Sequence, residues 1–340
     1  MKILRMFYSK TPKIKDKTGK VIPESITSLE KISLGALKQR ILIRGENTKN
    51  PILLFLHGGP GSTEMPMSHK FDRDLEKRFI CVHWDQRGAG KSFSMKTHKS
   101  SMNVQQFISD GIELVNKLKQ RFNQEKIFLV GHSWGSVLGM NLIHNYPEHF
   151  HAYIGIGQVV NMIESEKISY EYVLKRAKQQ NNKKAVKQLE KIKDKNVWNL
   201  RYSQIQRKWL TKFGGWYYKA TNSWVILKYL FISPEYSIID AIKFFIGVIF
   251  SLSNMWRRII ETVNFVDKIQ EIKIPVYFIV GKHDYNTPFE LVEKFYNNLK
   301  APKKELIWFE ESAHSPNYEE PEKYKDLLIN KILPEILINE

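Results

Sequence analysis

The sequence predicts an α/β fold in which a mostly parallel central sheet is flanked by helices and carries an inserted helical cap. Short, continuous apolar runs recur along the chain, as at residues 52–56, and such runs suit strands that are buried on both faces. Amphipathic helical stretches alternate with these runs, which favours one parallel-rich sheet. The alternation stops near residue 161 and returns near residue 275, which marks the segment between as an insertion.

The first part of the chain supplies two antiparallel strands and then the alternation. Residues 29–34 and 39–43 alternate apolar and polar side chains and are separated by the turn signal Gly35. Buried strands are expected at residues 52–56, 79–84, 127–130 and 151–156, and helices at residues 104–122 and 136–145.

The second part divides at the insertion. Residues 161–264 contain long, lysine-rich helical segments without a buried-strand run, whereas strands return at 275–280 and 305–309, with helices at 289–299 and from about 320. We therefore expect a core formed by residues 1–160 and 265–340, with a helical cap at 161–264. The cap would cover the carboxyl ends of the strands, where open α/β sheets place their sites.

The strongest chemical signal is a G-x-S-x-G motif at residues 131–135, with Ser133 at its centre. It follows a predicted strand and opens a predicted helix, which is the context of a nucleophile elbow. The glycines permit the sharp turn. The helix N-terminus offers N–H groups to a developing oxyanion. We expect Ser133 to be a nucleophile.

An acid and a base follow in the chain order that this elbow requires. Asp284 comes just after the strand at 275–280, and His314 follows the strand at 305–309. Both loops lie at the same edge of the sheet as Ser133, which predicts a triad of Ser133, His314 and Asp284. His283 is the competing histidine, but its position next to Asp284 makes it an awkward base.

Two glycine-rich loops accompany the elbow. Residues 57–61, His-Gly-Gly-Pro-Gly, follow a buried strand and can aim a backbone N–H at a substrate oxygen, with a second N–H from Trp134. In the loop 84–92 we expect Asp85 and Arg87 to pair and brace the backbone. A phosphate-binding loop there is disfavoured, because its first glycine would have to stand where Asp85 is.

The composition is that of a globular protein, with 42% hydrophobic and 26% charged residues. A net charge of +18 raises nucleic acid, anionic membranes and acidic substrates as partners. The sequence shows neither a zinc-ligand spacing nor an RNA-binding aromatic signature. We expect a solvated basic surface, no specific nucleic-acid partner, and no metal or organic cofactor.

The single cysteine, Cys81, excludes an intrachain disulfide and is compatible with a reducing compartment, so we expect a cytoplasmic location. The N-terminus lacks an apolar region long enough for a signal peptide. Residues 224–232 and 238–252 are strongly apolar, but charged residues interrupt both. We expect no membrane span; peripheral contact with a membrane stays open, as does the oligomeric state.

Together these motifs resemble the proline iminopeptidase (prolyl aminopeptidase) family of serine peptidases, which have the α/β-hydrolase fold. The resemblance implies the triad above, with the backbone amides of Gly59 and Trp134 as the oxyanion hole. The sequence differs from the family pattern at His132, where the peptidases usually have glycine. The motifs that carry it are residues 57–61, 85–92, 131–136, 281–284 and 313–315.

The resemblance also implies release of an N-terminal residue, often proline, from a peptide, with cap carboxylates that hold the free amine. A buried ammonium needs a paired charge, and the candidates by position are Glu164, Glu166, Glu235 and Glu261. We expect a serine hydrolase that acts through an acyl-enzyme on a small peptide. Two alternatives stay open: a carboxylesterase or lipase-like hydrolase with an apolar cap, and a non-catalytic binding protein on the same fold.

Overall fold

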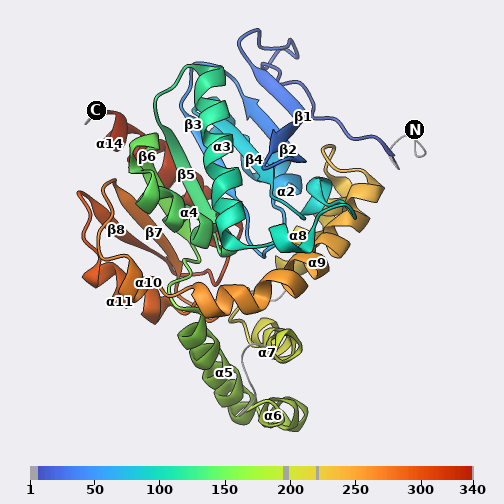
Figure 1. Cartoon of the computed structure of the whole chain (residues 1–340), viewed down its shortest axis with the longest axis vertical. Coiled ribbons are helices and arrows are strands. Elements are labelled where there is room, and N and C mark those ends of the chain that lie inside the picture. The colour runs from blue at the N-terminus through green and yellow to red at the C-terminus, as the bar shows by residue number, and fades with distance from the viewer. Residues whose placement is uncertain (1–6, 194–198, 220–221, 339–340) are drawn as a thin grey trace.

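The computed structural model describes residues 7–193, 199–219 and 222–338 and is built around one eight-stranded sheet (Figure 1). The strand order is β1-β2-β4-β3-β5-β6-β7-β8. Strand β2 is antiparallel to both β1 and β4, and the strands from β4 to β8 run parallel to one another. The strands are β1 Ile26–Leu34, β2 Leu37–Gly45, β3 Ile52–Leu56, β4 Ile80–Asp85, β5 Ile127–His132, β6 Phe150–Ile156, β7 Val276–Gly281 and β8 Lys304–Phe309.

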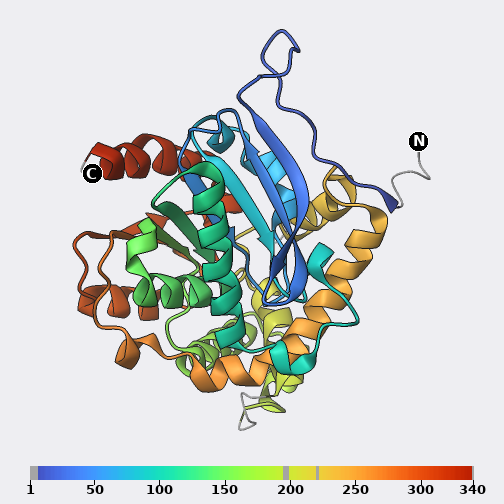
Figure 2. The same ribbon diagram turned by 45° about the horizontal axis from the view of Figure 1, so that its top comes forward.

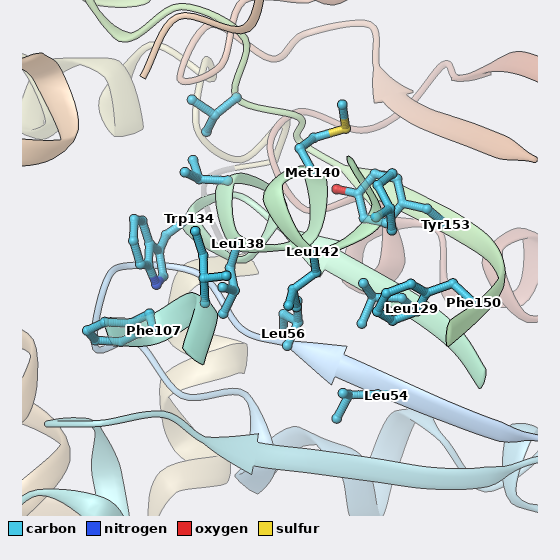
Figure 3. Close-up of a cluster of buried hydrophobic side chains, with 14 of the residues drawn as sticks. Leu54, Leu56, Phe107, Leu129, Trp134, Leu138, Met140, Leu142, Phe150 and Tyr153 are labelled. Carbon is cyan, nitrogen blue, oxygen red and sulfur yellow. The ribbon is translucent and has the colours of Figure 1, made fainter. Parts of the chain in front are cut away.

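Both faces of the sheet are covered, which explains why its central strands are buried and largely apolar, and why β3 is apolar at every position. In β3, Leu54 points to one core cluster and Leu53 to another, as the two-residue period of a strand requires. The first cluster packs against α3 (Val104–Phe122), α4 (Trp134–Asn145) and α11 (Phe289–Asn298), and Figure 3 shows its centre. The second packs against the C-terminal helices.

The predicted elements are confirmed with small shifts at their ends. Helix α3 has the expected bounds, and α4 begins two residues earlier than expected, at Trp134. The expected C-terminal helix is instead broken into α12 Pro316–Glu319, α13 Pro321–Asp326, a π-helical stretch Leu327–Ile332 and α14 Leu333–Ile338. Prolines at the starts of α12 and α13 account for the first break, because proline cannot continue a helix from within.

A series of helices lies between β6 and β7, where the sequence predicts an insertion. They are α5 Met162–Gln179, α6 Lys183–Glu190, α7 Leu200–Lys212, α8 Asn222–Ile232 and α9 Ile238–Thr262, followed by the short α10 Phe265–Lys268. Helices α5 to α7 share a core of their own and project from the sheet (Figure 1). The C-terminal half of α9 joins the main core through Met255 and Ile259, so α9 belongs to both parts. The boundaries at residues 161 and 264 stay predictions.

Helix α9 has a second notable property. By length and composition it could cross a membrane, with a mean hydropathy of 1.6 although only 33% of that stretch is buried. It is the one such helix in the described part of the chain. Its N-terminus is closed by a capping box between Ser237 and Asp240, and Gly247 and Ser251 lie against the loop at Gly88. The helix thus lies along the core as an amphipathic element (Figure 2).

Candidate active site

Ser133 sits on a strained turn between β5 and α4. Its φ of 53° and ψ of −118° are unusual for a residue other than glycine. The flanking glycines make the turn feasible: a Cβ at Gly135 would lie 1.9 Å from the carbonyl oxygen of Leu56, and one at Gly131 would lie 2.7 Å from the carbonyl oxygen of Gly135. The turn therefore presents Ser133 at the carboxyl edge of the sheet, as a nucleophile elbow does.

The structure brings the three predicted site residues into one hydrogen-bonded line. His314 Nε2 lies 2.9 Å from Ser133 Oγ, and His314 Nδ1 lies 2.9 Å from Asp284 Oδ2. His314 and Asp284 are buried. The competing His283 instead stacks on Tyr218 with ring centroids 4.2 Å apart. The arrangement has the geometry of a nucleophile, a base and an orienting acid; the catalytic roles themselves stay predictions.

The Asp284 carboxylate is held by the turn that follows it. Its Oδ1 accepts the backbone N–H groups of Asn286 and Thr287 at 2.8 and 2.9 Å, and its Oδ2 accepts the Thr287 hydroxyl at 2.7 Å. These bonds fix the carboxylate and leave Oδ2 toward His314. Sequence reasoning missed Asn286 and Thr287, although an Asp followed by such a turn is a recognisable side-chain-to-backbone motif.

His314 is packed tightly by backbone from three loops. Its N–H donates to Trp216 O at 3.1 Å. A Cβ at Gly157 would lie 2.8 Å from its ring, and a Cβ at Gly281 would lie 1.9 Å from Ala313 O. Burial lowers the pKa of His314 despite the opposing Asp284 carboxylate. The imidazole is therefore neutral near pH 7 and ready to accept a proton.

A second histidine–carboxylate pair, not found from the sequence, lies beside the pair of His314 and Asp284. His132 Nδ1 lies 2.6 Å from Glu64 Oε1, and His132 Nε2 lies 2.9 Å from the carbonyl oxygen of His314. Glu64 also accepts the N–H of Gly58 at 3.2 Å and the hydroxyl of Tyr318 at 3.1 Å. One buried carboxylate thus links the glycine-rich loop, the elbow and the base loop.

The pKa shifts of this pair favour its charged form. Burial disfavours the imidazolium, but the Glu64 carboxylate and the hydrogen bonds outweigh it and raise the pKa of His132. Burial likewise opposes the carboxylate, while His132 and the Gly58 N–H lower the pKa of Glu64 overall. Both ring nitrogens of a charged His132 donate, one to Glu64 and one to His314 O.

The expected pair of Asp85 and Arg87 is wrong. Arg87 donates from Nε and Nη2 to the two oxygens of Asp110 on α3, both at 2.9 Å. Asp85 instead accepts the hydroxyls of Thr63 and Tyr236 and the N–H of Lys91. Side chains on other elements therefore take the place of the expected pairing, and each residue does brace its loop.

A cavity of about 620 Å³ opens onto Ser133. Gly59 and Trp134, the predicted oxyanion-hole residues, line it together with His314. Most of the remaining wall is apolar: it comprises Met67, Val137, Val159, Met162, Leu200, Trp216, Leu227, Phe244, Phe245, Val248, Ile249, Leu252, Trp256 and Ile259. Among the described residues of the wall, Glu64 is the one carboxylate.

The predicted amine-binding residues are not among the described residues that line this cavity. Glu164 is bonded to Lys167 on the surface of α5, and Glu261 to Arg257 on α9. Glu235 is buried, but it accepts the hydroxyls of Thr11 and Ser233 away from the cavity. Glu166 pairs with Arg207, whose side chain reaches the wall. The sequence could not show which way these glutamate side chains face, because packing sets the rotation of each segment.

Comparison with known proteins agrees with this architecture. Residues 51–321 match the model of the alpha/beta hydrolase fold family. The chain is 34% identical over 314 residues to the probable aminopeptidase YbaC of Bacillus subtilis, covering 91% of this chain and 98% of that protein. It is 24% identical to the proline iminopeptidase of Saccharolobus solfataricus, covering 84% and 85% of the two chains.

Solved structures show the same fold. A proline iminopeptidase-related protein from Thermus thermophilus superposes with a TM-score of 0.63 at 16% identity, covering 90% of this chain and 96% of that one. Proline iminopeptidase from Mycobacterium smegmatis gives a TM-score of 0.61 at 16% identity, with 92% and 100% covered. The protein is an α/β-hydrolase. Within that fold, the chain belongs to the proline iminopeptidase family.

Proposed function

We propose that this hydrolase forms an acyl-enzyme at Ser133 and acts as an aminopeptidase that releases an N-terminal residue from a peptide. The observation that carries the proposal is the line of hydrogen bonds from Ser133 Oγ through His314 to Asp284, each 2.9 Å long. The family membership and the aminopeptidase name of the Bacillus subtilis relative support the peptide substrate.

In the proposed mechanism His314 Nε2 takes the Ser133 proton as the oxygen attacks the carbonyl carbon of the scissile bond. The N–H groups of Gly59 and Trp134 stabilise the oxyanion of the tetrahedral intermediate. His314 then returns the proton to the leaving amine as the C–N bond breaks. Water, deprotonated by His314, attacks the acyl-enzyme, and the proton passes back to Ser133 as the acid is released. Asp284 keeps the imidazole in the required tautomer.

The cavity wall points to an apolar acyl group. Most of the residues that line it are aliphatic or aromatic, and its carboxylate, Glu64, is already paired with His132. Glu64 is the one carboxylate that the described wall residues offer to the substrate's amine, so a cationic side chain would find no second one. We therefore propose that the released residue is proline or another apolar residue.

The same wall favours a second candidate, a carboxylesterase that accepts an apolar acyl chain. An uncharged ester needs the same attack and the same oxyanion donors, but it needs no carboxylate to hold an amine. Peptidase and esterase therefore differ in whether a free amine is recognised, which substrates can decide.

The test measures hydrolysis of prolyl, leucyl and alanyl arylamides, their N-acetyl forms, and short and medium acyl esters. Ser133→Ala is the control for the nucleophile. Rapid cleavage of free-amine arylamides that is lost on N-acetylation supports the aminopeptidase. Cleavage of esters alone replaces the aminopeptidase with the esterase. A protein that hydrolyses none of these substrates and does not react with a serine-directed fluorophosphonate would be a binding protein. The cytoplasmic location stays a prediction, which cell fractionation tests.

A further inference from the structure

Exposed apolar side chains gather on one surface of the insertion. Of the fourteen large hydrophobic residues that are exposed in the described part of the chain, seven lie on α8 and α9. On α9 they follow helical spacing and form a single stripe, because residues three and four apart share a face. We call the seven the α8–α9 face: Phe231, Ile232, Ile238, Ile242, Phe245, Ile246 and Ile249.

The opposite side of α9 is fixed to the protein. Ala241 and Phe244 are buried in a cluster with Tyr236, and a Cβ on Gly247 would lie 2.7 Å from Gly88 O. Lys91 bonds to Asp240 in the capping box and to Ser9 at the N-terminal segment. The helix is therefore anchored along one side, while the side chains of its apolar stripe are exposed to solvent.

The N-terminal segment extends this surface. Lys10 donates its N–H to Pro234 O at 3.0 Å, in the turn between α8 and α9. Phe7 and Tyr8, which precede it, are both exposed. Phe7 and Tyr8 thus directly precede the segment that is bonded to the turn between α8 and α9. Aromatic side chains, tyrosine in particular, favour membrane–water interfaces.

The charges around the α8–α9 face are cationic. Between residues 222 and 256 the carboxylates are Glu235 and Asp240, and both are buried with hydrogen-bond partners. Lys228 is exposed and Lys243 is partly exposed in the same span. The whole chain carries a net charge of +18. An apolar stripe with lysines beside it, and with no exposed carboxylate between residues 222 and 256, suits a surface that is both apolar and anionic.

The cavity at Ser133 opens on this face. Phe245 and Ile249 line the cavity, yet they are 45% and 66% exposed. Side chains that border a cavity and also meet the solvent stand at its mouth. A partner or surface that covers the α8–α9 face would therefore also lie at the entrance to the active site.

We propose that the α8–α9 face docks on the surface of a bilayer that contains anionic phospholipid, with α9 in the plane of the interface and the cavity mouth toward the lipid. The apolar stripe inserts among the acyl chains near the headgroups, while the lysines contact phosphates. This inference goes beyond the proposed function, since docking needs neither Ser133 nor a particular substrate.

The test is sedimentation of the full chain with vesicles of phosphatidylcholine alone or mixed with phosphatidylglycerol. We expect binding to the mixed vesicles that weakens as salt is raised. The double variant Ile242→Glu/Ile246→Glu, which changes two stripe residues outside the cavity wall, is expected to weaken partitioning at least about tenfold. Leu337→Glu, an exposed apolar residue on α14 far from α9 (Figure 1), is the matched control and should bind as the unmodified chain does.

Three results would overturn the proposal. The first is that the chain sediments with neither kind of vesicle. The second is that the double variant binds as tightly as the Leu337→Glu control. The third is that light scattering shows a dimer that the double substitution dissociates, which would make the face an interface between copies. Circular dichroism and thermal unfolding of both variants show whether each is folded. Ser133→Ala should bind vesicles normally, so loss of hydrolysis and loss of docking are distinguishable.

Discussion

Glu64→Gln removes one charge from the pair that supports the base loop while keeping the size of the side chain. In the unmodified protein Glu64 binds His132, and His132 in turn binds the backbone oxygen of His314 at 2.9 Å. Without the carboxylate, His132 loses the partner that raises its pKa and becomes neutral. A neutral imidazole donates from one nitrogen only, so in the variant it can no longer donate both to the side chain at position 64 and to His314 O.

The sizes of the expected effects on stability and on kcat follow from these contacts. A charge-assisted hydrogen bond becomes a neutral one in a buried place, which should lower the free energy of unfolding by about 1–3 kcal/mol. If the His314 ring moves by a fraction of an ångström, kcat should fall roughly 10- to 100-fold. KM should change little, because the pair acts through His314 and not on the substrate.

Urea unfolding and steady-state kinetics measure both effects. The matched control is Asp72→Asn, which removes the carboxylate of another buried pair, His83 Nε2 and Asp72 Oδ2 at 2.6 Å, outside the cavity wall. It should lose stability but keep kcat. An unchanged kcat in Glu64→Gln, or an equal fall in both variants, would refute the positioning role. A rise in KM for free-amine substrates alone would instead mean that Glu64 binds the amine.

The stability of this pair should also depend on pH in both directions. Because the pKa of His132 is raised in the folded state, its contribution to the free energy of unfolding is lost as pH rises through that pKa. Because the pKa of Glu64 is lowered, its contribution is lost as pH falls through that lowered pKa. The pair therefore stabilises the fold between those two values, and Glu64→Gln should flatten this part of the stability profile. Asp284→Asn should lower kcat by about 10⁴-fold, because the imidazole loses the group that fixes its tautomer; an effect on KM alone would contradict this. Since burial lowers the pKa of His314, the acid limb of kcat/KM should lie below the ordinary histidine range, and a limb above it would argue against His314 as the base. Arg87→Leu should cost about 3–5 kcal/mol in urea unfolding, because it leaves Asp110 buried without its cation; a cost near that of a surface change would refute it.

The sheet and the three site residues could be predicted because each depends on a local pattern. Strands buried on both faces are apolar at every position, and β3 shows this without interruption. The elbow at Ser133 has its glycines at fixed spacing, and a Cβ at Gly135 would collide with Leu56 O. Asp284 and His314 each stand on the loop that follows a strand, so the parallel topology brings them to the same edge.

The rest of the site depends on contacts between distant parts of the chain. Glu64 and His132 are 68 residues apart in sequence, and no spacing rule links them. Arg87 could not be assigned to Asp110 because that partner stands on a helix whose rotation is set by packing. The predicted amine-binding carboxylates lie off the cavity wall for the same reason: Glu235 has the right charge but faces Thr11 and Ser233.

The most direct test of the central claim is labelling by a serine-directed fluorophosphonate followed by peptide mass spectrometry. Attack by Ser133 Oγ on the phosphorus atom would displace fluoride and leave a phosphonyl group on the serine. We predict stoichiometric label on the peptide that contains Ser133, none in Ser133→Ala, and slow labelling in His314→Ala. Label on another residue, or hydrolysis that survives in Ser133→Ala, would contradict the account.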